Sequence, residues 1–372
     1  MPINQLHEWH DDGFSGLNHN YIISPPMNRI LPKIKTLLLL TFFYAPAVNA
    51  QVADSTIVRL MKDKHIPTLG LAFVDKGEIF FSKVYGELNT GVSAPANTLF
   101  NVASITKTVT TMVTLCLVNS GDWDLDEPIY HYWTDPDVAA DPRSKKLTTK
   151  HILTHQSGFP NWRWMTPSKK LAFEFEPGLK FQYSGEGMEY LRHALESKFH
   201  RSLEQLADSL IFKPLHMNDT HFIWNDRMLD HFAVAHNSNG EPLEIIKNSS
   251  PSAADQLKTT VADYSKFLIW IIKGGGLSKA LYRQMTSPLS MIKENKFMGL
   301  GWAVYPDLGR EFCLSHSGID PGVNTIVFIL PKTSRALLIF TNSDNGPQIY
   351  TDLVKIFLKE QGNAIIATEM KN

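Results

Sequence analysis

Strand-forming segments lie near both ends of this 372-residue chain, and a long stretch with helical and loop patterns lies between them, at about 100–285. Near the start, 68–74 and 78–85 are apolar runs on either side of the turn Asp75-Lys76-Gly77, which predicts a β-hairpin. Four further strand patterns follow, at 299–305, 311–315, 323–330 and 335–341. A single sheet built from both chain ends, with a helical region inserted into it, is the α+β arrangement that satisfies this order.

Two amphipathic helices are predicted outside the helical stretch. Residues 53–64 and 348–359 each repeat apolar side chains at helical spacing. The apolar positions are Ile57, Leu60 and Met61 in the first helix and Ile349, Leu353, Ile356 and Phe357 in the second. Both helices are therefore expected to have one apolar face.

The segment Ser104-Ile105-Thr106-Lys107 places a hydroxyl and an amine three residues apart. On a helix, positions i and i+3 share a face, so the two groups can meet. Residues 108–118 carry no charge, which predicts a helix buried on all sides. Burial disfavours the charged form of a lysine, so Lys107 is expected to accept the proton of Ser104. This is the arrangement of an activated serine nucleophile.

The same S-x-x-K pattern occurs a second time, as Ser290-Met291-Ile292-Lys293. That copy follows Pro288 and continues into the polar residues 294–296, so no apolar helix surrounds its lysine. We therefore predict a surface segment without a catalytic role.

Two short motifs later in the chain carry a second set of candidate residues. Tyr183-Ser184-Gly185 follows a turn signal at 176–178 and precedes a helical pattern, so a loop could deliver Tyr183 to a site. His316-Ser317-Gly318 lies beside an expected strand, and Gly318 would let a substrate backbone approach closely. Taken singly, Tyr183 could be a packed aromatic residue and His316 a strand histidine bonded to a carbonyl.

The order S-x-x-K, Y-S-x and H-x-G, with 153–158 (LTHQSG) between the first two, resembles the serine β-lactamase and penicillin-binding-protein superfamily. More narrowly it is similar to the class C-related branch, which includes D,D-carboxypeptidases, D-aminopeptidases and esterases. The resemblance covers roughly residues 53–360. It implies a β-lactamase/transpeptidase-like α+β fold with an antiparallel sheet. The active site would lie in a cleft between an α/β part, about 51–100 and 286–372, and a helical part, about 101–285.

The resemblance also implies a mechanism. Ser104 would attack a carbonyl group to form an acyl-enzyme, and water would release the acyl group. Lys107 and Tyr183 would share the proton transfers, and either could be the base. The backbone N–H groups of Ser104 and Ile319 would form an oxyanion hole, in which one donor typically lowers the barrier by ~3 kcal/mol. Ser317, Gly318 and Gly185 would line the substrate site.

Two departures from the family pattern concern the substrate. His316 stands where class C β-lactamases carry lysine, so β-lactam turnover is not implied. It could hold a substrate carboxylate as a cation, or act as a neutral group that polarises Ser104 or Tyr183. Gly185 replaces the usual asparagine, so the amide that would hold the acyl side chain is missing. Trp162, Trp164 and Trp302 could line the cleft or pack in the core.

Other short patterns in the sequence lack the position or the residues that their usual function requires. Ser343-Asp344-Asn345 spells S-D-N but follows His316, so we predict a turn ahead of the last helix. His151 and His155 have zinc-ligand spacing, yet Ile152 replaces the required glutamate, which favours a structural helix end. The chain has no G-x-S-x-G elbow and no G-x-x-x-x-G-K phosphate loop. No cofactor and no metal are expected.

The composition limits the partners. The chain is 43% apolar and carries 36 basic and 37 acidic side chains, so attraction to nucleic acid or to an anionic membrane is not indicated. A small-molecule or short-peptide substrate is the expected partner. The two cysteines, Cys116 and Cys313, are predicted to be buried thiols rather than a disulfide.

The first 50 residues resemble a targeting segment. Basic residues at 29–35 precede the apolar run 37–44, and the small residues Val48-Asn49-Ala50 follow. This predicts a signal peptide cut before Gln51, with Met27 as the start and 1–26 as an upstream extension. Residues 51–372 would form the catalytic domain, periplasmic or secreted and without a stable membrane anchor.

These observations favour an exported serine hydrolase that forms an acyl-enzyme on Ser104 and cleaves a small ester or amide, with D-amino-acid peptides among the candidates. A β-lactamase or D,D-carboxypeptidase could use the same groups. A binding protein or sensor on the same fold, without turnover, is the alternative from another class.

Overall fold

The computed structural model describes residues 45–89 and 91–371. The chain divides into two compact units, Met1–Asn49 and Ala50–Asn372. Of the first unit, only the start of helix α1 (Ala45–Asp63) is described. The predicted upstream extension and most of the predicted signal peptide lie outside the described residues. The remaining description concerns the second unit.

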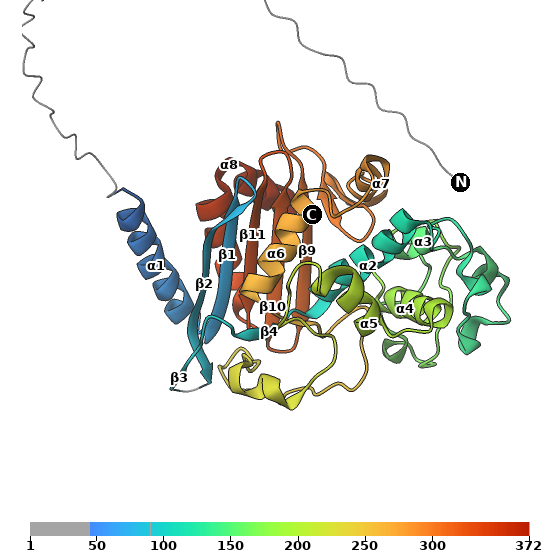
Figure 1. Ribbon diagram of the computed structural model, residues 1–372, viewed down its shortest axis with the longest axis horizontal. Helices are drawn as coiled ribbons and strands as arrows, with labels where there is room; N and C mark the ends of the chain where they lie inside the picture. Colours follow the sequence, from blue (N-terminus) through green and yellow to red (C-terminus); the bar gives the residue numbers. More distant parts are fainter. Residues whose placement is uncertain (1–44, 90, 372) are drawn as a thin grey trace, which may run out of the picture. The chain divides into compact units, whose positions relative to one another are not determined.

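An antiparallel sheet forms the centre of this unit, and its nine described strands follow the order β3-β2-β1-β11-β10-β9-β8-β7-β6 (Figure 1). Strand β1, from the start of the unit, pairs with β11, from its end, in the register Leu71↔Ile339. The prediction of one sheet built from both chain ends is therefore confirmed. The strands are β1 Thr68–Asp75, β2 Glu78–Asn89, β3 Val92–Ser93, β6 Ser290–Lys293, β7 Lys296–Met298, β8 Ala303–Tyr305, β9 Cys313–Asp320, β10 Val323–Leu330 and β11 Arg335–Thr341.

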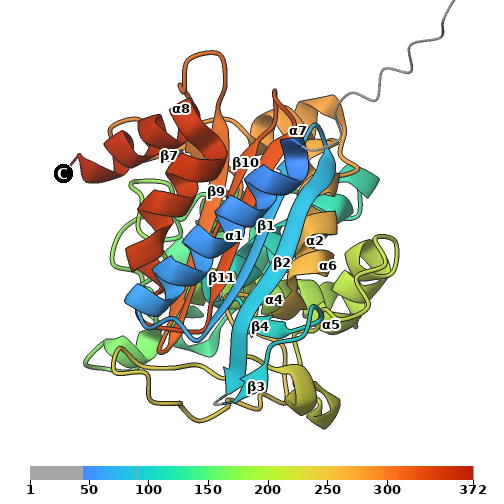
Figure 2. The same ribbon diagram turned by 90° about the vertical axis from the view of Figure 1, so that its left-hand side faces the viewer.

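Helices cover both faces of the sheet and also form a separate group beside it (Figures 1 and 2). Helix α8 and the described part of α1 share an apolar cluster with one face, in which Met61, Leu71 and Leu353 are buried. On the other face, Val109 and Phe267 belong to a second cluster, which continues into the helical region. The helices after α1 are α2 Thr106–Ser120, α3 Thr149–Leu153, α4 Gly185–Phe199, α5 Leu203–Ala207, α6 Val261–Ile272, α7 Lys279–Met285 and α8 Tyr350–Met370.

Helix α2 is buried almost all round, as its charge-free sequence predicts. Every residue from Thr106 to Leu115 is buried, and so is Leu117. Thr114 Oγ1 donates to the carbonyl of Thr110 at 2.9 Å, whereas the buried Thr111 Oγ1 has no hydrogen-bond partner among the described residues. The helix ends at Gly121, whose φ of 83° is the left-handed conformation that glycine adopts most easily.

The predicted hairpin of β1 and β2 is confirmed, and β10 and β11 have the bounds expected from the sequence. Two expectations were wrong, and one small sheet was not predicted. The strand predicted at 299–305 begins only at Ala303, because 299–302 form a turn in which Gly301 has a φ of 71°. The strand predicted at 311–315 continues to Asp320. A short sheet of β4 (Leu99–Asn101) and β5 (Lys258–Thr260) was not foreseen.

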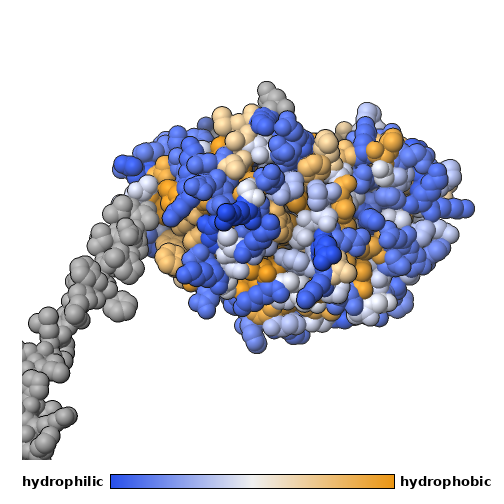
Figure 3. Space-filling model, turned by 90° about the horizontal axis from the view of Figure 1, so that it is seen from above, coloured by the Kyte–Doolittle hydropathy of each residue, from blue (hydrophilic) through white to orange (hydrophobic). Residues whose placement is uncertain are grey.

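The predicted C-terminal helix extends beyond its expected end. Helix α8 continues to Met370 and contains a break at Lys359, where φ is 53° and ψ is −120°. Residues 343–345 form the expected turn ahead of it, and Ser343 Oγ accepts a hydrogen bond from Asn345 N. Among the described helices, none is both long enough and apolar enough to span a bilayer. On the face in Figure 3, hydrophilic residues surround small hydrophobic patches.

Candidate active site

Ser104 lies in a turn of 3-10 helix, η1 (Ala103–Ile105), directly ahead of α2. The residue before it, Ala103, has a φ of 47°, which is unfavourable for a residue with a Cβ. Asn101 helps to hold this conformation, because its Oδ1 accepts a hydrogen bond from Ala103 N at 3.0 Å. The turn therefore presents Ser104 in a fixed orientation at the start of a buried helix.

Lys107 is only 1% exposed, and its Nζ lies 2.9 Å from Ser104 Oγ. The amine also donates to the carbonyl of Ala254 at 2.7 Å, and it lies 4.9 Å from the centre of the Tyr183 ring. No carboxylate forms a salt bridge with Lys107 in the part of the chain that the structure describes. The Ser104 hydroxyl thus contacts the Lys107 amine, and the amine in turn lies against the Tyr183 ring.

The loop before α4 carries Tyr183, and Ser184 caps the first turn of α4. Ser184 Oγ accepts from Gly187 N at 2.9 Å and donates to the carbonyl of Pro160 at 2.8 Å. Within the described residues no protein group hydrogen-bonds the Tyr183 hydroxyl. Because Tyr183 lines the same cleft as Ser104, that hydroxyl is available to a substrate.

His155 contributes to the site in a way that the sequence did not indicate. It follows α3 with a φ of 52°, and its ring lies 4.3 Å from the ring of Tyr183. Its Nδ1 accepts a hydrogen bond from Ser184 N at 3.2 Å. Burial and the nearby charge of Lys107 lower the pKa of His155 well below its usual value, so the imidazole is neutral. The predicted structural role at a helix end fits His151, whose side chain takes part in the N-terminal capping box of α3. His155 instead packs against Tyr183.

His316 lies on β9 and is also buried. Its Nδ1–H donates to the carbonyl of Ser317 at 2.8 Å, so Nε2 carries the lone pair. Burial, and then the charge of Lys107, lower the pKa of His316 to about 3. Of the two roles left open by the sequence, the neutral one matches this environment.

Strand β9 has a free edge beside Ser104. Among the described strands, β8 pairs with β9 only from Cys313 to Ser315. The β9 residues after Ser315 therefore have no strand partner on the β8 side. A Cβ on Gly318 would lie 2.3 Å from the carbonyl oxygen of Val102 and 2.9 Å from Ser104 N, so only glycine allows this approach. Ile319 follows and is 71% exposed. The two segments expected to supply the oxyanion hole therefore lie side by side.

Two carboxyl groups on the cleft wall carried no sequence motif. Asp255 and Asp320 share a side-chain hydrogen bond, and both line the cleft with Ser104. Asn101 Nδ2 donates to Asp320 at 3.0 Å, and Gln256 N donates to Asp255 at 2.7 Å. Burial, and then the neighbouring Asp255, raise the pKa of Asp320 to about 8, so the pair holds a proton at neutral pH.

Gly185 has no room for the side chain that the family usually carries there. A Cβ at this position would lie 2.6 Å from the indole ring of Trp162. Asn161 Oδ1 accepts from Gly185 N at 3.0 Å, and Asn161 also lines the cleft. Of the three tryptophans proposed for the cleft, Trp162 lines it, whereas Trp302 is fully buried in the core. Trp164 lines a neighbouring hollow.

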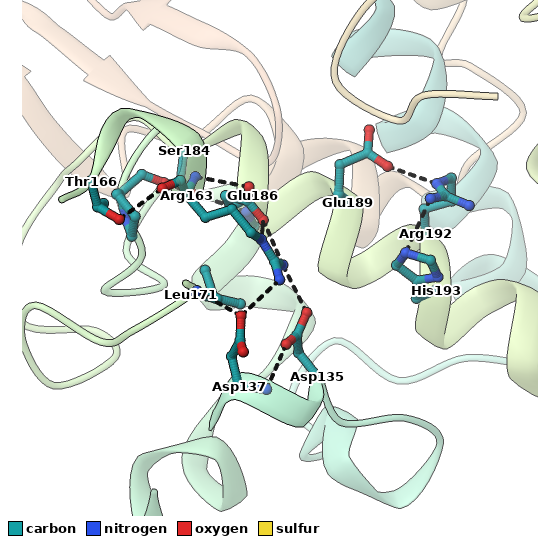
Figure 4. A network of polar contacts seen from close by, with 12 residues as sticks. Asp135, Asp137, Arg163, Thr166, Leu171, Ser184, Glu186, Glu189, Arg192 and His193 are labelled. Atoms are coloured by element: carbon teal, nitrogen blue, oxygen red, sulfur yellow. Dashed lines mark hydrogen bonds and ion pairs between the residues drawn. The ribbon is translucent and has the colours of Figure 1, made fainter. Parts of the chain in front are cut away.

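An ionic cluster fixes the loop that carries Asn161 and Trp162 (Figure 4). Arg163 Nη2 lies 2.7 Å from Asp135 and 2.8 Å from Glu186, which is in the first turn of α4. Arg163 Nη1 lies 3.2 Å from Asp137. The two closest carboxylates are almost completely buried, so the cluster ties the loop to α4 behind Tyr183.

The candidate groups surround one cleft of about 370 Å³. Ser104, Tyr183, His316, Ser317 and Ile319 line it, Lys107 lies directly behind Ser104, and Gly185 and Gly318 shape its walls. No group of three or more side chains suited to a metal ion is found in residues 45–89 and 91–371.

Ser290 and Lys293 of the second S-x-x-K copy do not line this cleft, although Ile292 between them does, and the prediction of a surface segment was partly wrong. Ser290 is buried on strand β6. Lys293 Nζ donates to the carbonyls of Glu369 and Lys371 near the C-terminus and not to Ser290. Both cysteines are free, with Cys313 buried and Cys116 half-buried.

An antiparallel sheet between helices, with a serine and a lysine one turn apart at its edge, defines the β-lactamase/transpeptidase-like class of fold. A family model described as Beta-lactamase matches residues 53–355. The chain belongs to the beta-lactamase family, whose members use a serine nucleophile. The family resemblance seen in the sequence is therefore confirmed.

Similar proteins are distant in sequence. Protein flp of Staphylococcus aureus strain MRSA252 is 22% identical over 320 residues, and the match covers 79% of this chain but only 63% of Protein flp. A Beta-lactamase of Pseudomonas fluorescens is 22% identical over 271 residues, which cover 69% of this chain and 74% of that protein.

Solved structures with the same fold include the octameric penicillin-binding protein homologue from Pyrococcus abyssi. Its TM-score is 0.71 at 21% identity, and the match covers 87% of this chain and 78% of that one. The D-alanine carboxypeptidase AmpC from Burkholderia cenocepacia has a TM-score of 0.68, 18% identity and coverage of 80% of this chain and 95% of its own. At these identities the likeness establishes the fold alone.

Proposed function

We propose that this protein is an exported serine hydrolase that forms an acyl-enzyme on Ser104 and cleaves a small ester or amide. The observation that carries the proposal is the contact of 2.9 Å between Ser104 Oγ and the buried amine of Lys107. The carbonyl of Ala254 holds that amine from a second direction, so it is positioned before a substrate arrives.

In the proposed reaction, Ser104 Oγ bonds to the carbonyl carbon of the substrate and loses its proton to Lys107, directly or through Tyr183. The bond to the alcohol or amine then breaks, and that leaving group takes the proton. Water attacks the acyl carbon in the second half, its hydroxyl stays on the acid product, and its remaining proton restores Ser104. The N–H groups of Ser104 and Ile319 would stabilise the oxyanion in both halves.

The charges in the cleft favour a neutral substrate over one that must present a carboxylate. His316 is neutral in the physiological range because its pKa is about 3. Lys296, which also lines the cleft, is paired with Glu369 at 2.9 Å. These groups therefore supply no free cation for the terminal carboxylate that a D,D-carboxypeptidase or a β-lactamase would bind.

Covalent labelling with a fluorophosphonate tests the proposal. Wild-type protein should become labelled and should hydrolyse p-nitrophenyl acetate. Ser104→Ala should lose labelling and lower kcat about a thousandfold or more. The matched control Ser290→Ala should retain both, because Lys293 does not contact Ser290. Loss of activity in Ser290→Ala instead would overturn the assignment.

Release of a bound acyl group distinguishes the alternatives. A hydrolase should release a fluorescent acyl label within its turnover time, whereas a sensor should keep it. Hydrolysis of nitrocefin or of D-alanyl-D-alanine peptides in preference to esters would favour the β-lactamase or carboxypeptidase alternative. Export rests on the N-terminal sequence, and mass spectrometry of the exported fraction should find a chain that begins at Gln51.

A further inference from the structure

A second hollow lies between helix α8 and the sheet, with a volume of about 700 Å³. Strands β9 and β10 form its floor, and both halves of α8 form its walls. Its inner lining is apolar and includes Ile326, Phe328, Val354, Ile365 and Ile366. A cavity of this size and lining suits a hydrocarbon group better than a polar one.

This hollow adjoins the catalytic cleft. The two share five lining residues, which are Lys296, Ala303, His316, Ser317 and Ile319. Strand β8 is short and stops pairing with β9 at Ser315, so no strand separates the two spaces beyond that point. A substituent that extends from the Ser104 side of the cleft past Ile319 would therefore reach the hollow without crossing a strand.

The break in α8 keeps the hollow open. Figure 2 shows α8 changing direction partway along its length, and the break lies at Lys359. The first half contributes Val354 to one wall, and the second half contributes Ile365 to the other. Glu369 anchors the second half, since Tyr305 donates to it at 2.6 Å and Lys296 lies 2.9 Å away. The two halves of the bent helix thus form walls of the hollow without filling it.

We propose that this hollow receives a hydrocarbon chain of the substrate, so that the hydrolase acts on esters or amides with a long alkyl substituent. The inference rests on the proposed function. In the hollow, the Lys296–Glu369 ion pair lies on the side of the catalytic cleft, where Lys296 lines both spaces. The apolar side chains line the rest of the hollow. A chain in this position would bury its methylene groups while the scissile carbonyl stays beside Ser104.

Two ester series measure the effect and identify which part of the substrate carries the chain. One series varies the acyl chain from about two to about twelve carbons with p-nitrophenol as the leaving group, a span over which each methylene adds buried area. The other keeps an acetyl group and varies the alcohol over the same span. In one series kcat/KM should rise up to about fourfold per methylene before it levels off. Flat profiles in both series would overturn the inference.

Variants that fill the hollow without touching the cleft provide the structural test. Thr351→Trp adds bulk from the exposed side of α8, and Ile326→Trp adds it from β10; both positions line the hollow and not the cleft. Each should lower kcat/KM for the longest chain at least about tenfold and leave the shortest ester unchanged. Ile356→Trp, on α8 but outside the hollow, is the matched control and should leave both unchanged.

The outcomes separate the two proposals. Hydrolysis of short esters without any gain from chain length would contradict the chain-binding role and leave the hydrolase intact. Absence of both labelling and hydrolysis at Ser104 would contradict the hydrolase itself. Equal losses on long and short esters in Thr351→Trp and Ile326→Trp would assign these residues a structural role and overturn the hollow as a binding site.

Discussion

At the scale of single residues, the cleft combines one strained residue with three buried nitrogen-bearing side chains. Ala103 holds Ser104 through a left-handed φ of 47°. Lys107 contacts the hydroxyl, and His155 and His316 lie close enough to Lys107 for its charge to lower the pKa of each imidazole. Burial acts in the same direction, so both imidazoles are neutral, and the Lys107 amine is the group that contacts the serine hydroxyl.

The neutral state of His316 predicts a pH profile. Its pKa of about 3 means that it should not titrate between pH 5 and pH 9. Activity on anionic and neutral esters should therefore show the same pH dependence. His316→Lys should lower kcat/KM for neutral esters at least about tenfold, because a cation at this position would disfavour proton uptake by the nearby Lys107. A selective loss of anionic substrates as pH rises through 6.5 in the wild type would contradict this expectation.

At the scale of elements, the turn between β7 and β8 meets helix α2 at Gly301. A Cβ there would lie 1.9 Å from Thr111 Oγ1, and Gly301 N donates to the carbonyl of Leu153. This contact links the edge of the sheet to the buried helix that carries Lys107. It also explains why 299–302 cannot continue the predicted strand, since the positive φ of Gly301 turns the chain toward α2.

Gly301→Ala should therefore lower the free energy of unfolding by about 3 kcal/mol, through the clash and the unfavourable φ together. Gly309→Ala is the control, since its φ of 77° is similar but no atom lies within 4 Å of the added Cβ. That control should cost only about 1 kcal/mol. Urea unfolding of both variants measures the difference, and equal losses would show that the contact with Thr111 is unimportant.

At the scale of the whole molecule, the cleft joins segments that are far apart in the chain. Asp255 comes from the loop before β5, and Asp320 ends β9, yet their carboxyl groups share a proton. The Arg163 cluster likewise connects Asp135, in a loop, with α4. The carboxyl pair therefore joins the helical region to strand β9, whereas the Arg163 cluster connects segments within the helical region.

The carboxyl pair predicts how stability depends on pH. The folded protein keeps the Asp320 proton until about pH 8, whereas the unfolded chain releases it near pH 3.8. Between these values the folded state binds more protons, so stability falls as pH rises. Asp320→Asn cannot ionise and should lose less stability from pH 5 to pH 9, by at least about 1 kcal/mol, since one pKa unit corresponds to about 1.4 kcal/mol.

Urea unfolding across this pH range checks the prediction. The exposed Asp230→Asn serves as the control and should follow the wild type. A profile for Asp320→Asn that runs parallel to the wild type would mean that the pair does not share a proton in the folded protein.

The sequence by itself determined the features that depend on neighbouring residues. The β1–β2 hairpin, the buried helix α2 and the pairing of Ser104 with Lys107 all follow from local periodicity and from i, i+3 geometry. The order of the three motifs also indicated the family. These properties could be predicted because few conformations of a short segment satisfy such patterns.

Only the tertiary structure decided the features that combine distant segments. Asp255 meets Asp320, His155 supports Tyr183, and the side chain of Trp162 takes the space at Gly185. No local pattern marks these residues, because each acquires its surroundings from chain that is remote in sequence. The hollow under α8 likewise depends on the early end of β8 and on the break at Lys359, which together leave space that no periodicity describes.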